Sequence, residues 1–440
     1  MELHRDDALD RLPAYHEDGV TVYLGDAREV MADLPAESID CVVTSPPYWG
    51  LRDFRVPLTV WGGEPACRHR WSGLQRGRRK DLLPSDSTAR RARVGLTDRQ
   101  DAAATNGGRF CLDCDAWLGS LGLEPTPQLF VAHLVELFRD VRRLLKPTGL
   151  VWLNLGDTFY TSAMSRPGST DHGLKPKDLV GVPWRAALAL QADGWFLRSD
   201  IIWHKPNPIP EPANDRPARA HELLFLLSRQ PRYYYDAEAV REPAVSRPSS
   251  TPWPMPAIHG GKYSQPHDPR VRSATKYARR DAPQSLDRHR RSVWTIATEP
   301  FRGSHTATFP TRLVEPCVLA GSSAAGCCSH CGRPWERVVE ISYEPLSRRR
   351  EGRQDRRVFE LEQRQVRRAR TTGWRPTCAC DADVTPAVVL DPFAGTGTTL
   401  KVAKQHGRHA IGIELNPEYV DLIRRRCAGV ASDAPREEAA

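Results

Sequence analysis

Two patterns of apolar residues recur along the chain and predict its regular elements. Runs of mainly apolar residues that stop at a turn are typical of buried strands, and apolar residues at helical spacing are typical of helices that face a core. The first pattern predicts strands at residues 20–24, 39–44, 150–155, 196–203, 386–390 and 410–413, with a further apolar element at 221–228. The second pattern predicts helices over residues 29–34, 127–145, 183–192 and 398–405. Because strands alternate with helices, we expect an α/β fold built on a mostly parallel sheet.

Three stretches break this periodicity. Residues 66–116 and 241–292 are rich in basic and turn-forming residues and poor in apolar ones, so we interpret them as an insertion and a variable region. Residues 348–370 are charged and helix-prone, which favours a solvated helix or a mobile arm. The expected organisation is a core at 18–65 and 117–240, an insertion at 66–116, a variable region at 241–292, a core segment at 293–320, an insertion with the charged arm at 321–385, a βαβ unit at 386–430 and a tail at 431–440.

Composition narrows the class of protein. The 440 residues are 40% hydrophobic and 27% charged, as expected for a soluble globular protein. No run approaches the roughly 18 apolar residues that a membrane helix needs, and residues 1–10 lack the apolar region of a signal peptide. We therefore expect a cytoplasmic protein with no membrane partner. The net charge of +9 suits a polyanionic partner, although a basic protein without such a partner fits it equally well.

A glycine-rich turn follows the predicted strand at 386–390 and leads into the helix at 398–405. Its candidate ligand-binding residues are Asp391, Pro392, Phe393, Gly395, Thr396, Gly397 and Thr398. The glycines permit a close approach of the backbone to a ligand, and a helix N-terminus directs N–H groups toward it. Glu414 ends the next strand about 20 residues on, where a carboxylate can accept both hydroxyls of a ribose. The pattern predicts an adenosine-containing ligand; a structural turn beside a surface glutamate is the simpler alternative.

The residues of this turn leave two adenosine cofactors open, NAD and S-adenosylmethionine. The dinucleotide fingerprint requires a third glycine, and Leu400 occupies that position here. The turn therefore departs from the pattern that cradles a pyrophosphate.

A second turn, formed by Ser45, Pro46, Pro47 and Tyr48, follows the predicted strand at 39–44. The prolines stiffen the backbone, and carbonyls in such a turn, with the Ser45 hydroxyl, can accept hydrogen bonds from an amino group. Acceptors placed in this way would direct the nitrogen lone pair at an electrophilic methyl group and stabilise the charge that grows on nitrogen. Tyr48 could stack on a base flipped out of a duplex. A proline-rich loop with an exposed aromatic residue is the alternative.

Taken together, the two turns resemble those of the DNA amino-methyltransferase family. The turn at 45–48 is similar to the catalytic turn of that family, and the turn at 391–398 is similar to its cofactor turn. The catalytic turn precedes the cofactor turn in the chain, and this order is similar to that of the permuted β group of the family. The resemblance extends to residues 25–27, where Asp26 would contact the cofactor, to residues 305–310, where Thr308 and Phe309 would lie beside it, and to residues 203–207.

The resemblance implies a Rossmann-like, seven-stranded, mostly parallel sheet and methyl transfer from S-adenosylmethionine to double-stranded DNA. It also implies a target-recognition region at 241–292 and allows a cognate restriction endonuclease as partner. In this family a serine at the first position of the catalytic turn is typical of cytosine-N4 enzymes, and aspartate or asparagine of adenine-N6 enzymes. Ser45 therefore favours cytosine N4, with adenine N6 as the alternative.

Three further classes stay open at this point. The catalytic turn also fits an amino group of RNA or protein. A zinc-dependent DNA-binding protein without catalytic activity would share the basic insertions but would not bind the cofactor. An NAD-dependent oxidoreductase lacks support because the third glycine is missing.

Eight residues form two candidate zinc sites, one in each insertion. They are Cys67, His69, Cys111 and Cys114 in the first, and Cys328, Cys331, Cys378 and Cys380 in the second. The Cys-x-x-Cys spacing suits tetrahedral zinc, and a metal would supply folding energy to segments that have few apolar residues. Cys327 and His330 could compete for the second site, whereas Cys41 and Cys317 are expected in the core.

Two basic runs are candidates for contact with DNA. Residues 76–80 and 270–291 carry clustered Arg and Lys, which would mainly contact phosphates. A solvated charged loop is the alternative for each run.

Overall fold

In the computed structural model of the chain, the described residues fall into two compact units. They are residues 11–54, 56–72, 108–160, 173–243, 284–285, 287–299, 309–345 and 365–431. The first unit lies within Met1–Asp236, Arg291–Trp335 and Pro376–Ala440, and the second within Ala237–Arg290 and Glu336–Arg375.

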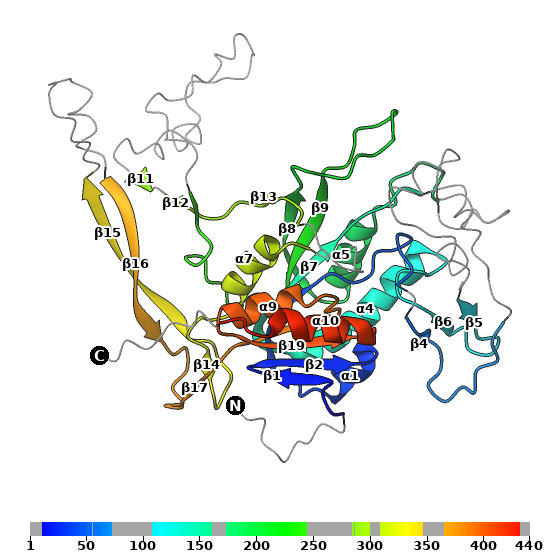
Figure 1. The fold of residues 1–440 in the computed structure, drawn as a ribbon, viewed down its shortest axis with the longest axis horizontal. Helices are drawn as coiled ribbons and strands as arrows, with labels where there is room; N and C mark the ends of the chain where they lie inside the picture. The colour runs from blue at the N-terminus through cyan, green and yellow to red at the C-terminus, as the bar shows by residue number, and fades with distance from the viewer. Residues whose placement is uncertain are drawn as a thin grey trace, which may run out of the picture. The chain divides into compact units, whose positions relative to one another are not determined.

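A nine-stranded sheet forms the centre of the first unit (Figure 1). Its order is β1 (Tyr15–Glu17), β2 (Val20–Leu24), β19 (His409–Glu414), β18 (Val388–Asp391), β3 (Ile39–Thr44), β7 (Leu145–Leu155), β9 (His221–Ser228), β8 (Phe196–His204) and β13 (Val293–Thr295). The strands from β2 to β7 are parallel, and β9 runs antiparallel to both of its neighbours. The mostly parallel α/β sheet is confirmed, and two three-residue edge strands, β1 and β13, extend it beyond the seven expected strands.

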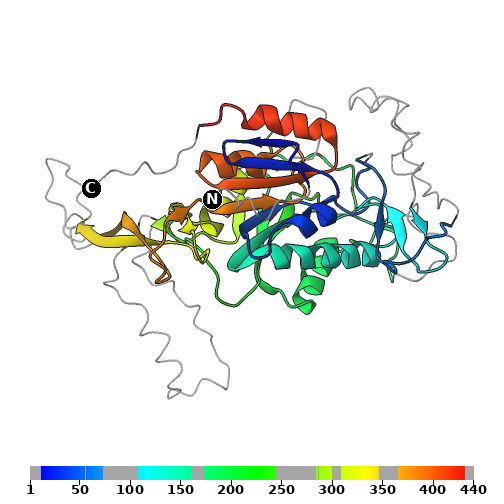
Figure 2. The same cartoon turned by 90° about the horizontal axis from the view of Figure 1, so that it is seen from below.

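Six helices of the described residues cover this sheet. They are α1 (Ala27–Asp33), α4 (Pro127–Leu144), α5 (Val182–Ala192), α7 (Thr311–Gly321), α9 (Thr398–Gln405) and α10 (Pro417–Cys427). Helices α1, α4 and α5 pack together on one face, and α7, α9 and α10 on the other (Figure 2). A cluster of buried apolar side chains includes residues of α1, α4 and α5 and of the strands beneath them.

Helix α4 shows how local sequence sets these boundaries. Thr126 caps its N-terminus by accepting a hydrogen bond from the Leu129 N–H at 3.1 Å, and Pro127 occupies the first turn. The apolar face packs on the core, and the helix ends at Leu144. Strand β7 then begins at Leu145, earlier than the expected start at residue 150, because its first residue already pairs with Ile39 of β3.

Two small sheets accompany the cysteine-containing segments. Strands β4 (Thr59–Trp61) and β5 (Arg109–Phe110) both pair antiparallel with β6 (Trp117–Gly119). Strand β14 (Cys327–Cys328) pairs antiparallel with β17 (Val384–Thr385).

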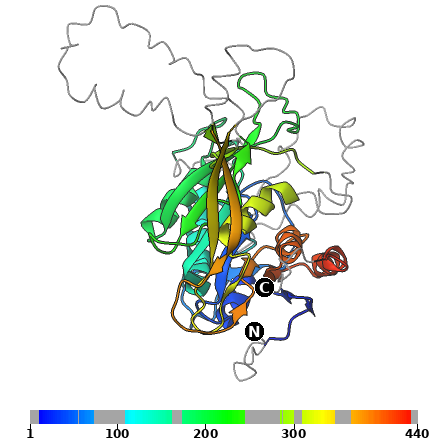
Figure 3. The same ribbon diagram turned by 90° about the vertical axis from the view of Figure 1, so that its left-hand side faces the viewer.

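The second unit is built from short strands and a long hairpin. Its strands are β10 (Glu242–Pro243), β11 (Gln284–Ser285), β12 (Asp287–Arg288), β15 (Glu336–Pro345) and β16 (Gln365–Arg375). Strands β15 and β16 pair antiparallel over their full length (Figure 3). The expected helix or mobile arm at 348–370 is therefore wrong for residues 365–370, because pairing with β15 overrides their helical propensity.

Among the described residues, no helix combines the length and the apolar character that crossing a membrane would require.

Candidate active site

A cavity of about 780 Å³ lies at the carboxyl ends of the parallel strands in the first unit. Strands β3 and β18 are neighbours in the sheet, so the turns that follow them, 45–48 and 392–397, meet at one edge. This edge is where ligands bind in open α/β sheets. The cavity is lined by Ser45, Pro46, Pro47, Tyr48, Asp26, Phe309, Asp391, Pro392, Phe393, Gly395, Thr396, Thr398 and Glu414, among others.

Two of the predicted cofactor residues do not share this placement. Gly397 is not among the residues that line the cavity; it caps the start of α9 with φ 74°. A Cβ at this position would lie 2.9 Å from the side chain of Ile423 in α10, so a larger residue would require that side chain to shift, in addition to the strain of the positive φ. Thr308 lies outside the described residues.

Asp391 joins the cofactor turn to the catalytic turn. Its carboxylate accepts hydrogen bonds from Thr44 Oγ1 at 2.7 Å and Thr399 Oγ1 at 2.8 Å, and from the Phe393 N–H at 3.1 Å. Burial raises the pKa of Asp391 to about 6, although these donors oppose the shift. Since both oxygens have internal donors, the carboxylate fixes the turn beside Ser45.

Glu414 presents a buried carboxylate to the cavity. Its Oε2 accepts the Gly395 N–H at 2.7 Å, and its Oε1 accepts the Asn416 N–H at 2.8 Å. Burial raises the pKa of Glu414 to about 7, and Asp391 adds to the shift. Each oxygen retains a lone pair, so the carboxylate can accept two further hydrogen bonds from a ligand.

Asp26 lies at the start of α1, on the same rim as Glu414. Its carboxylate accepts the Arg28 N–H at 2.9 Å and forms an ion pair with the Arg28 guanidinium at 3.0 Å. Burial would raise the pKa of Asp26, but Arg28 outweighs burial and holds the pKa below its usual value. The guanidinium also lies 3.6 Å from the centre of the Trp61 ring, which connects Asp26 to strand β4.

A chain of hydrogen bonds leads away from the catalytic turn. Ser45 Oγ donates to the Tyr48 hydroxyl at 3.2 Å, which in turn lies 2.8 Å from Glu222 Oε2. The Tyr48 hydroxyl also lies 3.0 Å from Asn154 Oδ1, and Lys205 donates to Glu222 from the other side. Burial, with the charge of Glu222, raises the pKa of Tyr48 well above its usual value, so the phenol stays protonated.

Some residues that shape the site are absent from those expected from the sequence, among them Glu222, Arg28 and Arg426. Glu222 is a charged residue in the apolar run of β9, which is a usable signal for a functional carboxylate. Arg28 and Arg426 carry no such signal, because arginine is common on the exposed faces of helices and does not stand out in the sequence. Arg426 of α10 donates to the Thr396 carbonyl at 2.6 Å and so braces the cofactor turn.

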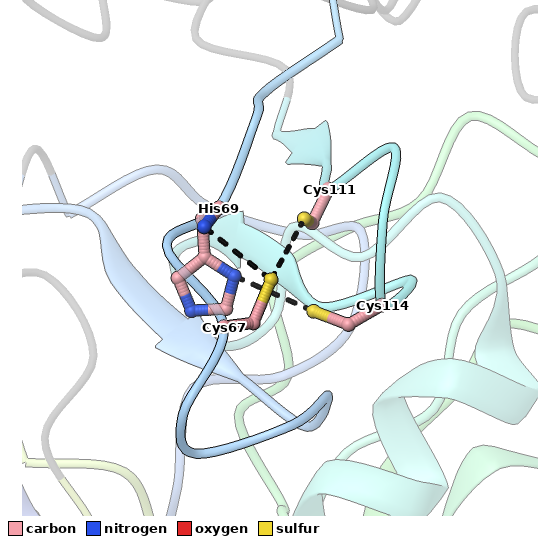
Figure 4. Close-up of side chains that lie close together, drawn as sticks. All are labelled: Cys67, His69, Cys111 and Cys114. Atoms are coloured by element: carbon pink, nitrogen blue, oxygen red, sulfur yellow. Dashed lines mark hydrogen bonds between the residues drawn. The ribbon is translucent and has the colours of Figure 1, made fainter.

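Both predicted metal clusters assemble in the first unit. In the first, the side chains of Cys67, His69, Cys111 and Cys114 point toward one another (Figure 4). Cys67 Sγ lies 3.8 Å from Cys111 Sγ, and Cys114 Sγ lies 3.4 Å from His69 Nδ1.

In the second cluster, the thiols of Cys328, Cys331, Cys378 and Cys380 likewise all lie within 4.8 Å of one another. Cys327 does not compete, since its thiol donates to Asp40 at 3.1 Å, and His330 is not part of the cluster. Cys41 and Cys317 are buried in the core, as expected.

The basic runs are little represented among the described residues. Residues 76–80 lie outside them, as do most of residues 270–291. The proposed contacts of both runs with DNA stay predictions.

Comparison with known proteins places this site in a family context. The profile of the N6/N4 DNA methylase family matches residues 39–327 and 386–425. The Type II methyltransferase M.Cfr9I of Citrobacter freundii is 32% identical, with 100% of this chain and 96% of the relative aligned. M.SmaI of Serratia marcescens, also a Type II methyltransferase, is 34% identical over 92% of this chain and 89% of the relative. A solved structure, the cytosine-N4-specific PvuII DNA methyltransferase, aligns over 95% of this chain and 90% of its own with 16% identity and a TM-score of 0.46.

Proposed function

Because this chain belongs to the N6/N4 DNA methylase family, we propose that it transfers a methyl group from S-adenosylmethionine to the exocyclic N4 of cytosine in a specific DNA sequence. The observation that carries the choice of base is Ser45, the residue type that is typical of cytosine-N4 enzymes. Adenine N6 remains the alternative. Membership of this family removes the support for an oxidoreductase.

The residues around the cavity fit the cofactor. Glu414 is buried, faces the cavity and retains acceptor capacity for the two ribose hydroxyls, and Asp26 would accept from the adenosine part. Gly395 allows close approach of the backbone, and Phe393 and Phe309 add apolar surface. S-adenosylmethionine, when bound, supplies an electrophilic methyl group on a sulfonium.

Ser45 and the carbonyls of the adjacent prolines would hold the hydrogens of the target amino group. These acceptors would direct the nitrogen lone pair toward the methyl group, and the positive charge that develops on nitrogen would strengthen their hydrogen bonds. The hydrogen bond between Thr44 and Asp391 supports this role, since it fixes the catalytic turn against the cofactor turn. Tyr48 lines the cavity, and its ring would lie beside the flipped base.

The nitrogen gains a methyl group and must lose one proton. The chain from Ser45 through Tyr48 to Glu222 could carry this proton: Ser45 accepts it as its own proton passes to Tyr48, and the Tyr48 proton passes to Glu222. A protonated exocyclic nitrogen is strongly acidic, so a carboxylate paired with Lys205 is basic enough to accept. Glu222 would then release the proton to solvent.

The net charge of +9 favours a polyanion such as DNA as the substrate. Arg52, Lys205 and Arg219 line the cavity together with several carboxylates, so they provide individual donors to the substrate. The Arg52 Nη1 nitrogen is buried and has no hydrogen-bond partner within the described part of the chain, so it can donate to an acceptor atom of the substrate. We also propose residues 241–292 as the target-recognition region, a cognate endonuclease as a partner, and structural zinc in both cysteine clusters.

The test is to incubate the zinc-loaded protein with unmethylated genomic DNA and S-adenosylmethionine, and to identify the modified nucleosides by mass spectrometry. We expect N4-methylcytosine with the wild type, none with Ser45→Ala, and a strongly reduced rate with Glu222→Gln at unchanged cofactor affinity. N6-methyladenine would overturn the choice of base. If the protein binds the cofactor but methylates no base in DNA, the substrate would be RNA or protein. If it does not bind the cofactor, it would be a DNA-binding protein without catalytic activity.

A further inference from the structure

The first cysteine cluster has the dimensions of a tetrahedral zinc site. With Zn–S bonds of about 2.3 Å and Zn–N bonds of about 2.0 Å, neighbouring ligand atoms should lie about 3.5 to 3.8 Å apart. The sulfur-to-sulfur distance of 3.8 Å between Cys67 and Cys111 and the 3.4 Å between Cys114 and His69 agree with this geometry. The Asp113 N–H also donates to Cys111 Sγ at 3.4 Å, a contact that stabilises a thiolate.

The four ligands come from two segments that are far apart in sequence. Cys67 and His69 follow β4, whereas Cys111 and Cys114 lie between β5 and β6. The sheet of β4, β5 and β6 has strands of only two or three residues, which is too small to persist by itself. A metal ion that joins the two segments would supply the missing stability.

Strand β4 forms one wall of the cavity. Thr59 and Trp61 line it, and the indole Nε1 of Trp61 is buried with no hydrogen-bond partner in the described segments. Arg28 stacks on Trp61 and donates to the Val60 carbonyl at 2.9 Å while it pairs with Asp26. The position of β4 therefore determines both the shape of this cavity wall and the orientation of the Asp26 carboxylate.

The loop after β6 supports the catalytic turn in the same way. The Gly50 N–H donates to the Gly122 carbonyl at 2.8 Å, and Trp49 Nε1 donates to the Glu124 carbonyl at 2.9 Å. The Glu124 carboxylate lies 3.0 Å from His133 Nδ1, and the His133 ring stacks on Trp61 at 4.8 Å.

The second cluster offers an internal control. Its four cysteines lie at the small sheet of β14 and β17. The ligands of neither cluster line the cavity themselves, but residues of β4 do, and no residue of β14 or β17 does. Both clusters are candidate zinc sites, but only the first adjoins a small sheet with residues in the cavity wall.

We propose that a zinc ion bound by Cys67, His69, Cys111 and Cys114 holds strand β4 in place and thereby determines the affinity of the cavity for its cofactor. The second site would stabilise its own small sheet without this effect. The proposal deepens the proposed function, on which its cofactor-binding part rests; its metal-binding part stands independently.

The experiment compares Cys114→Ser with Cys331→Ser in the full chain. Zinc content is measured by atomic mass spectrometry and S-adenosylmethionine affinity by calorimetry. We expect about two zinc ions in the wild type and about one in each variant. The affinity of Cys114→Ser should fall at least about tenfold, and that of Cys331→Ser should stay within about twofold of the wild type.

Each outcome has a distinct meaning. A wild type that neither contains nor takes up zinc would overturn the metal sites. Loss of one zinc ion from Cys114→Ser at unchanged cofactor affinity would overturn the coupling. If Cys114→Ser does not fold, Trp61→Phe tests the cavity wall while both metal sites stay intact. We expect this variant to bind the cofactor severalfold more weakly at full zinc content. An unchanged affinity would refute the coupling. A wild type that binds zinc but not S-adenosylmethionine would refute the proposed function and leave the metal sites standing.

Discussion

The carboxylates of this site differ in role because their hydrogen-bond partners differ. Asp391 accepts from three internal donors and fixes the two turns, whereas Glu414 accepts from two backbone N–H groups and faces the cavity. Glu222 lies next to the catalytic turn and receives hydrogen bonds from Tyr48 and Lys205. Similar side chains thus serve positioning, cofactor binding and proton uptake in our proposal.

The raised pKa of Glu414, about 7, predicts a pH dependence of cofactor affinity. The ionised carboxylate accepts both ribose hydroxyls, so protonation below pH 7 removes an acceptor and weakens binding. Affinity should therefore be about tenfold lower at pH 6 than at pH 8, since each unit below the pKa costs up to tenfold. Calorimetric titrations with S-adenosylmethionine across this range measure the effect.

Glu414→Gln is the matched control. It cannot ionise, so its affinity should be weaker than that of the wild type at pH 8 and nearly independent of pH. A wild type with a flat profile and a Gln variant of equal affinity would show that the carboxylate does not bind the ribose.

At the scale of elements, the sheet order creates the site. Because β18 pairs with β3, the two turns meet although they lie far apart in sequence. Strand β7, the next neighbour, ends close to the ring of Tyr48 and contributes Asn154 to its hydrogen bonds. Gly156, just after β7, leaves room for this ring.

Gly156→Ala should impair catalysis more than cofactor binding. Its Cβ would lie 2.5 Å from Tyr48 Cε2, so the ring must move and the chain from Ser45 to Glu222 would be disturbed. We expect kcat to fall at least about tenfold, as small displacements at a reacting centre have large effects, with cofactor affinity within about twofold.

The control for this change is Gly373→Ala in β16, where no atom lies within 4 Å of the added Cβ. It should leave kcat near the wild-type value. Equal kcat values for the two variants would argue against a role of the Tyr48 ring position.

At the scale of the whole molecule, charge should govern the association with DNA. The chain has a net charge of +9, which attracts a polyanion. Binding that releases counterions weakens linearly with the logarithm of salt concentration. Cofactor binding involves no such release.

We therefore expect the Kd for DNA to rise at least about tenfold between about 50 and 200 mM salt, while the Kd for S-adenosylmethionine changes less than about twofold. Fluorescence anisotropy with labelled duplex and calorimetry with the cofactor provide the two values. A Kd for DNA that is insensitive to salt would contradict phosphate contacts as the main source of affinity.

The sequence by itself determined the local features of this protein. The apolar runs predicted β2 and β3 with the observed bounds, and the cysteine spacing predicted both clusters that the structure brings together. These features are encoded within a few residues, because side-chain periodicity and ligand spacing act over one element or turn. The family resemblance extended this reading to the cofactor and to methyl transfer.

Only the tertiary structure decided which distant residues meet. The pairing of β18 with β3, the place of Glu222 beside Tyr48 and the stacking of Arg28 on Trp61 depend on strand order and long-range packing. For the same reason β16 forms a strand where its composition favoured a helix, since its hydrogen-bond partners lie in β15. Contacts between elements produce no periodic pattern in the sequence, so they could not be predicted from it. Such contacts also connect the first metal cluster with the cavity.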